Sequence, residues 1–424
     1  MPLQHDESKV AFDYSSFGVI LMSQDLKKDQ EGMTRRTLLT TVAAGLGTAL
    51  VSGKGAAAEA VSAESADASE QERRIVSDLG ERSSFENPRR LVGSISPNSA
   101  SNTPLQDLDG FITPSDLHYE RHHFGIPNID PDKYTLRVDG LVDRPMTFTL
   151  KELKKLPVQT EIRYLECGGN GVLGFAGMTP ELTPQQIDGM VSTSEWTGTT
   201  LASLWDLVGP KTEATWFQAE SHDGDWAQSV PMSERWDDSL IAWGQNGEAI
   251  RPEQGYPARL LLAGQPGGPN VKWISRIELK SGPIPEETLM AFSSIFGAKS
   301  LITYPAYPNV IAEPGKVSIS GLAWSGRGKI TRVEISADGG RTWEDADLQQ
   351  PVLSKCQTRF RHDWHWDGND ALLMSRATDE TGNVQVTLEE ARAVREANVD
   401  IRHYFNNIRA WAVASDGVVT FSNS

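Results

Sequence analysis

The chain has 424 residues, of which 38% are hydrophobic and 23% charged, so it contains enough apolar material for a folded core and is not a disordered protein. A chain of this length predicts two folded domains. Its formal net charge of -17 argues against a nucleic-acid-binding surface but is compatible with docking to a basic protein partner.

The N-terminal region has the features of an export signal. Residues 34–39 read Thr-Arg-Arg-Thr-Leu-Leu, followed by an apolar, small-residue stretch at 40–52 and an Ala-rich segment at 56–60. This order is typical of twin-arginine signal peptides, which export folded proteins, and the alternative is an ordinary Sec signal or an uncleaved anchor. Because the apolar stretch is short and rich in Gly and Ala, we expect a periplasmic protein without a membrane span in the mature chain.

Short strands and helices alternate in the first part of the folded region. Alternating apolar and polar residues predict a strand at 134–140, and 161–166 is a second strand that ends at Cys167. Helical or turn patterns occupy 148–156 and 201–208, and two further strand-like runs are 258–262 and 271–279. The first domain is therefore expected to be a mixed α+β domain.

The pattern changes after residue 302 to close-set strands with Gly-rich turns. Strands are predicted at 316–322, 329–336 and 371–378, and Asp338-Gly339 between two such runs is a hairpin signal. This predicts an all-β, immunoglobulin-like sandwich in which the tryptophans pack in the core and interfaces. We expect the following organisation: 1–60 signal peptide with an N-terminal extension, 61–96 linker, 97–288 first domain and 289–424 second domain.

The cysteines restrict the chemistry. Only Cys167 and Cys356 occur, so a disulfide framework is excluded, and no C-x-x-C-H sequence offers attachment for a c-type haem. Cys167 precedes Gly-Gly-Asn-Gly, a loop that lets a bulky ligand approach the sulfur. On spacing alone it is either a structural thiol or a metal ligand or nucleophile, and a cysteine hydrolase would also need a partner histidine.

Cationic residues gather at three other places. The segment 121–127 reads Arg-His-His-Phe-Gly-Ile-Pro and suits an oxyanion or a cofactor phosphate, although without further context a solvated basic loop is the more common explanation. Arg259 and Lys272 lie beside strand-like segments, where they are either phosphate ligands or strand-edge charges. His222 and the Asp-Gly-Asp run at 223–225 form a polar turn that alone indicates little.

Taken in order, these segments resemble the sulfite oxidase family of molybdenum enzymes over essentially the whole chain after the leader. Six segments in the first domain match the family's motifs: Arg121–Pro127, Cys167–Asn170, Trp196–Gly198, Asp223–Asp225, Gly255–Arg259 and Val271–Trp273. In the second domain, Gly321–Gly326 and Ser336–Trp343 look like the family's dimerisation domain. The match is a set of ordered motifs, which makes coincidence improbable.

The resemblance implies a molybdenum-molybdopterin cofactor and assigns roles to particular residues. It implies that Cys167 ligates molybdenum and that Arg121 faces the substrate, so these two are the expected catalytic residues. The residues expected to contact the cofactor are His123, Cys167, Asp223, Arg259, Val271 and Lys272. Since the chain has no haem motif, its electrons are expected to leave through a partner.

Departures from the family pattern bear on the substrate. Where sulfite oxidases have arginines after the C-x-G-N motif, this chain has Gly171-Val172, a cofactor-side histidine is replaced by Gln254, and the family's late active-site arginine has no clear match at 404–407. Fewer cations weaken a pocket for a small dianion. This pattern looks like the SoxC-type sulfane dehydrogenase subunits, which act on sulfane sulfur carried by a partner protein and pair with a dihaem cytochrome c.

The resemblance therefore predicts a sulfur-carrier protein and a c-type cytochrome subunit as partners, and a homodimer or heterotetramer. The first alternative is a periplasmic sulfite dehydrogenase that acts on free sulfite. An alternative of another class is a non-catalytic scaffold subunit of a sulfur-oxidising complex, against which the retained Cys167 argues. A cysteine hydrolase is a third and weaker alternative.

Overall fold

The computed structural model describes residues 79–177, 179–222, 224, 226–232, 237–283, 295–397 and 405–422. Residues from Pro88 onward belong to one compact unit, and residues 21–87, of which 79–87 are described, form a second unit. The predicted signal peptide and residues 61–78 of the predicted linker lie outside the described residues. None of the described helices is long and apolar enough to cross a bilayer.

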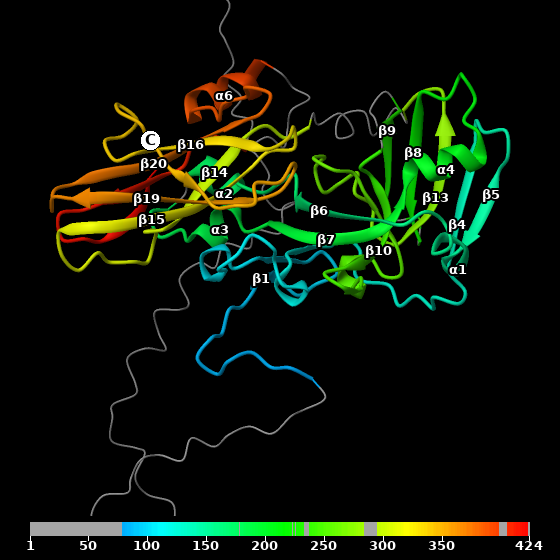
Figure 1. Cartoon of the computed structure of the whole chain (residues 1–424), viewed down its shortest axis with the longest axis horizontal. Helices are drawn as coiled ribbons and strands as arrows, with labels where there is room; N and C mark the ends of the chain where they lie inside the picture. The colour runs from blue at the N-terminus through cyan, green and yellow to red at the C-terminus, as the bar shows by residue number, and fades with distance from the viewer. Residues whose placement is uncertain are drawn as a thin grey trace, which may run out of the picture. The chain divides into compact units, whose positions relative to one another are not determined.

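A five-stranded sheet with the order β5-β4-β13-β8-β9 forms one part of the first domain (Figure 1). Its strands are β4 (Thr135–Gly140), β5 (Met146–Thr149), β8 (Trp216–Ser221), β9 (Ala227–Pro231) and β13 (Ile274–Lys280). In β4, the buried Leu136 and Val138 alternate with exposed polar residues, which gives the strand one face in the core. Two helices adjoin these strands: α1 (Leu150–Leu153) and α4 (Leu201–Val208).

A second sheet carries the loop that contains Cys167. Its order is β11-β10-β7-β6, with β12 paired to β10. The strands are β6 (Gln159–Glu166), β7 (Val191–Thr200), β10 (Leu240–Gln245), β11 (Glu248–Ala249) and β12 (Arg259–Leu261). A small sheet consists of β1 (Leu91–Ser94), β2 (Ala100–Asn102) and β3 (Glu120–Arg121).

Short helices complete the first domain. Helices α2 (Val172–Ala176) and α3 (Pro184–Asp188) follow β6, and single 3-10 turns are η3 (Leu105–Asp107), η4 (Ser115–Leu117) and η5 (Pro252–Gln254). Thr183 caps α3 in a capping box with Gln186, which satisfies backbone donors at the start of this short helix.

Two antiparallel sheets form the second domain. One has the order β14-β15-β19-β18 and the other β17-β16-β20-β21-β22. The first contains β14 (Lys299–Tyr304), β15 (Gly315–Trp324), β18 (Asp347–Leu348) and β19 (Thr358–Trp366). The second contains β16 (Ile330–Ser336), β17 (Glu344–Asp345), β20 (Ala371–Asp379), β21 (Ala410–Val413) and β22 (Val419–Ser422).

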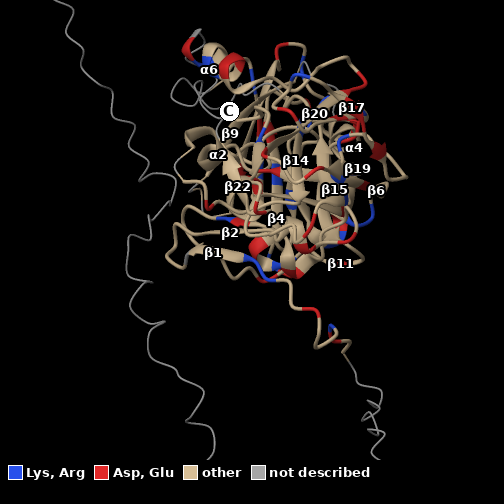
Figure 2. Ribbon diagram, turned by 90° about the vertical axis from the view of Figure 1, so that its left-hand side faces the viewer, with Lys and Arg blue, Asp and Glu red and all other residues tan. Residues whose placement is uncertain are grey.

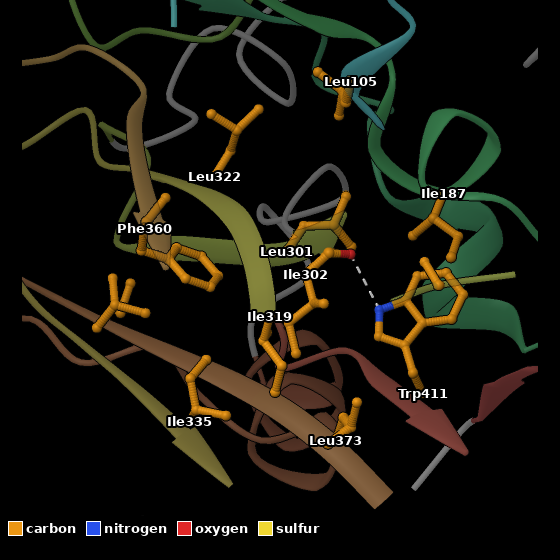
Figure 3. Close-up of a cluster of buried hydrophobic side chains, with 14 of the residues drawn as sticks. Leu105, Ile187, Leu301, Ile302, Ile319, Leu322, Ile335, Phe360, Leu373 and Trp411 are labelled. Atoms are coloured by element: carbon orange, nitrogen blue, oxygen red, sulfur yellow. Dashed lines mark hydrogen bonds between the residues drawn. The ribbon is translucent and has the colours of Figure 1, made fainter. Parts of the chain in front are cut away.

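The core of the sandwich continues into the first domain. Figure 3 shows Leu301, Phe360 and Trp411 in this cluster, where Trp411 Nε1 donates to the carbonyl of Ile302 at 3.2 Å. Leu105 and Ile187 of the first domain pack into the same cluster. These apolar contacts join the two domains and hold the second domain against α3. Helix α3 in turn lies close to the Cys167 loop, because Asp188 of α3 lies beside Gly171.

The predicted fold class, an α+β domain followed by an immunoglobulin-like sandwich, is confirmed. The helix at 201–208 and the strands at 161–166 and 329–336 lie within one or two residues of their predicted positions. Helix α6 (Leu388–Ala397) is an addition that the sequence analysis missed, and its acidic and basic residues are visible in Figure 2.

Two local predictions are confirmed with changed bounds. The strand expected at 271–279 is β13, which begins only at Ile274, because Trp273 has a positive φ of 52° outside the extended region. Asp338-Gly339 does lie in a hairpin connection, because β16 pairs antiparallel with β17, but these residues do not form a tight two-residue turn, since β17 begins at Glu344. Instead, Oδ1 of Asp338 accepts hydrogen bonds from the backbone N–H groups of Arg341 (3.0 Å) and Thr342 (2.9 Å) and organises a longer loop.

Candidate functional site

Cys167 is presented at the end of β6. This strand pairs with β7 over its whole length, and the N–H of Cys167 donates to the carbonyl of Met190 at 3.0 Å just beyond the last pair. The chain then turns, with the N–H of Asn170 bonded to the carbonyl of Cys167 at 2.9 Å. The thiol is half-buried and forms no disulfide. A regular strand therefore fixes the backbone that carries the sulfur.

A glycine loop approaches the cysteine from the other side. The N–H of Gly267 donates to the carbonyl of Glu166 at 2.7 Å. A Cβ at Gly267 would lie 3.2 Å from that oxygen and 3.4 Å from Cα of Cys167. A side chain at position 267 would therefore crowd the cysteine, and glycine keeps this approach open.

Two of the predicted cations, Lys272 and Arg259, form no ion pair with a carboxylate among the described residues. Lys272 Nζ donates to the carbonyls of Glu253 (3.0 Å) and Arg121 (3.2 Å). Arg259 is buried and donates to the carbonyls of Gln254 and Asn270, both at 3.0 Å. Burying cations that are bonded only to neutral acceptors is costly unless an anionic ligand completes the site.

The surroundings shift the pKa values of these groups. Burial, followed by the charge of Arg259, places the pKa of Lys272 well below its ordinary value, and burial lowers the pKa of Arg259 to about 10. Burial raises the pKa of the Cys167 thiol, while the backbone N–H of Gly169 and the charge of Arg121 lower it. An anion next to Lys272 and Arg259 would favour their charged forms, so both cations suit a phosphate-bearing ligand.

The two adjacent histidines have different environments. His122 is buried, with Nδ1 2.9 Å from Lys272 Nζ and Nε2 3.0 Å from Glu120. Burial, and then Lys272, lowers its pKa to about 3, so this ring is neutral. His123 stacks on Trp226 with ring centroids 4.9 Å apart, and Trp226 Nε1 donates to the carbonyl of Gly268 at 3.0 Å. His123 is therefore oriented beside the loop that contains Gly267 and Gly268.

The structure brings most of the predicted site residues together. Arg121, Cys167 and Lys272 are close enough to influence one another's pKa, and Arg259 affects Lys272. Val271 is buried in the core, with its carbonyl accepting from the N–H of Leu260, so only its backbone position relates it to the site. Asp223 lies outside the described residues.

Several residues around the site were not predicted to form part of it. Trp226 orients His123, whereas Gln254, already expected at the position of a cofactor-side histidine, donates to the carbonyl of Tyr119 at 2.8 Å. Lys299 and Arg409 come from the second domain and are bonded to Glu166 and Asp188 beside the cysteine loop. Glu166, a charged residue directly after the buried Tyr164 and Leu165, was the one available signal, because a buried charge requires a partner.

The donor set fits a molybdenum-molybdopterin group. A cysteine thiolate is a soft ligand that suits molybdenum, and glycines at 267 and 268 leave room beside it. Arg259 and Lys272 offer positive charge to a phosphate, and His123 offers an imidazole at the same side. These are the residues that would hold the cofactor.

Comparisons with known proteins agree with this geometry. The model of the oxidoreductase molybdopterin binding domain matches residues 123–287, and that of the Mo-co oxidoreductase dimerisation domain matches residues 293–408. A solved structure described as the sulfane dehydrogenase SoxCD from Paracoccus pantotrophus is similar with a TM-score of 0.77 and 35% identity, covering 84% of this chain and 96% of that chain.

Curated relatives are more distant. Mitochondrial sulfite oxidase of Mus musculus is 27% identical over 345 residues, covering 70% of this chain and 61% of the relative. The NADH nitrate reductase of Ulva prolifera is also 27% identical, over 321 residues, covering 65% of this chain and 37% of the relative. The chain thus spans less than two thirds of these relatives' lengths.

The chain belongs to the sulfite oxidase family of molybdopterin oxidoreductases, and the structure to which it is similar places it with the SoxC-type members. The predicted family, oxidoreductase class and molybdenum-molybdopterin cofactor are thereby confirmed.

Proposed function

We propose that this chain is the molybdenum-bearing subunit of a periplasmic sulfane dehydrogenase. Its substrate is sulfane sulfur bound to a carrier protein, and its electrons pass to a c-type cytochrome subunit. The similarity to the SoxCD structure supports the substrate class, and the match to a dimerisation domain supports a multi-subunit assembly, either a homodimer or a heterotetramer. The twin-arginine sequence at 34–39 supports export, since that route carries folded proteins that have already acquired a cofactor.

The observation that carries the substrate proposal is the lack of room for a side chain at Gly171. A Cβ at this position would lie 2.5 Å from Nη2 of Arg409 and 2.8 Å from Oδ1 of Asp188. No side chain fits there, so the arginine that the sulfite oxidase pattern has after C-x-G-N is excluded by shape. The cation that lies there instead, Arg409, is already paired with Asp188. The pocket therefore offers less free positive charge to a small dianion such as sulfite.

The residues of this chain have distinct parts in the reaction. When bound, the molybdenum-molybdopterin group supplies the two-electron chemistry. Cys167 ligates its metal, and Arg259, Lys272 and His123 hold its pterin and phosphate. Arg121, whose guanidinium is bonded to Asn98 Oδ1 at 2.7 Å, carries positive charge at the substrate side of the cysteine.

A comparison of two substrates tests this proposal. The full-length, cofactor-loaded chain is assayed with a cytochrome c acceptor, once with sulfane sulfur on a carrier-protein cysteine and once with free sulfite. We expect kcat/KM for free sulfite to be lower by about 100-fold or more, the effect of losing one well-placed cationic donor. Rapid turnover of free sulfite would instead identify a sulfite dehydrogenase, and loss of both activities in molybdenum-loaded protein would favour a scaffold subunit.

A further inference from the structure

Four charged side chains form a buried network behind the loop that contains Cys167. Lys299 Nζ lies 2.9 Å from Oε1 of Glu166 and 2.6 Å from Oδ1 of Asp188. Arg409 Nε lies 3.2 Å from Oδ2 of Asp188. Each side chain is at most 4% exposed. Two carboxylates are balanced by two cations, so the network is neutral and every member depends on the others.

The network is bonded to both ends of the cysteine loop. Glu166 directly precedes Cys167, and its Oε1 accepts a hydrogen bond from Asn170 Nδ2 at 2.9 Å. At the other end, Arg409 Nη2 donates to the carbonyl of Gly171 at 3.2 Å. The residue before the thiol and the residues after the turn are therefore held by the same charged groups.

Both cations of the network come from the second domain. Lys299 is the first residue of β14 and pairs in register with Trp324, the last residue of β15. Trp324 Nε1 donates to Oε2 of Glu166 at 2.7 Å, so this carboxylate is held on both oxygens. Arg409 directly precedes β21. The sandwich thus supplies the groups that fix a loop of the first domain.

We propose that Lys299 and Arg409 are positioning residues that hold the Cys167 thiol in the geometry in which it ligates molybdenum, an inference that rests on the proposed function. They act through Glu166 and Gly171. The second domain then supports the metal site in addition to any part in dimerisation. A change at the start of β14 is transmitted to the thiol loop through the Lys299–Glu166 pair.

The test compares the full-length, cofactor-loaded wild type with Lys299→Met and with the control Lys316→Met. Lys316 lies on β15, is 70% exposed and pairs with Asp363 on the surface. Hydrogen exchange is followed by mass spectrometry on peptides that cover the cysteine loop and on peptides from β8 and β13. We expect Lys299→Met to raise exchange in the loop by about tenfold or more, with β8 and β13 unchanged and the control like wild type.

Two further readouts separate positioning from general destabilisation. Lys299→Met should shift the electron paramagnetic resonance signal of the one-electron-reduced metal, which senses its thiolate ligand, and should increase molybdenum loss on dialysis by about 10-fold. If Lys299→Met does not fold, the double variant Glu166→Gln with Lys299→Met removes one charge of each sign. Raised loop exchange in that variant supports the proposal.

Loop exchange at the wild-type level in the folded Lys299→Met or double variant would overturn the proposal. Molybdenum content of the wild type is measured separately and tests the proposed function alone. Full molybdenum loading with unchanged loop exchange in Lys299→Met therefore rejects the positioning role without rejecting the enzyme.

Discussion

Gly171 provides a sharp test of the packing around the cysteine loop. Its φ is +90°, and a Cβ would meet Arg409 Nη2 at 2.5 Å, Asp188 Oδ1 at 2.8 Å and the carbonyl oxygen of Phe405 at 2.8 Å. Gly171→Ala therefore combines backbone strain with overpacking against a buried ion pair. Gly247 is a matched control, because it also has a positive φ, +79°, but has no atom within 4 Å of its Cβ position.

Subtracting the loss of stability in Gly247→Ala from that in Gly171→Ala separates the overpacking from the backbone strain. Left-handed backbone conformation costs an alanine about 1–2 kcal/mol in both variants. Overpacking adds about 1–3 kcal/mol in Gly171→Ala alone, because the contacted atoms belong to a bonded network and the backbone. We expect urea unfolding of the full chain to show Gly171→Ala less stable than Gly247→Ala by this amount. Equal free energies of unfolding for the two variants would refute the close approach of Arg409.

Two further predictions concern the cofactor cation Lys272 and the buried His118. Lys272→Met should lower the molybdenum content per chain by about 10- to 100-fold. The control Lys280→Met removes a cation from a surface pair with Glu278 and should leave the molybdenum content unchanged. Equal molybdenum content in the two variants would contradict the role of Lys272 in binding the cofactor phosphate. Burial lowers the pKa of His118 from 6.5 to about 3, so the unfolded chain binds the proton first as pH falls below about 6.5. Between pH 7 and pH 5, the free energy of unfolding, measured in urea, should fall by about 2 kcal/mol more for wild type than for His118→Gln. An equal fall in the two proteins would show that the His118 ring is not held neutral by burial.

Local features of the chain were predictable from the sequence. The strand before Cys167, the glycine loop after it and the helix at 201–208 depend on residues that are neighbours in sequence. Their patterns of apolar residues and glycines therefore indicate the local secondary structure directly. The motifs that contain Arg121, Cys167, Arg259 and Lys272 were therefore found before their spatial arrangement was known.

The buried network could not be predicted in this way. Lys299 lies 133 residues from Glu166, and Arg409 lies 221 residues from Asp188. Such pairs form only once the sandwich packs against the first domain, and nothing in either local sequence specifies the partner. The late start of β13, after Trp273, also escaped prediction, because a positive φ at a bulky residue is imposed by its tertiary surroundings.

Molybdenum per chain, measured in protein purified from the periplasm, tests the central claim most directly. Wild type is compared with Cys167→Ser and with Cys356→Ser, whose thiol is fully buried in the second domain beside Thr193. We predict near-stoichiometric molybdenum in wild type and Cys356→Ser, with activity lost in Cys167→Ser. Exported, folded wild type without molybdenum, or a Cys167→Ser variant with full metal and full activity, would contradict the assignment of Cys167 as the metal ligand.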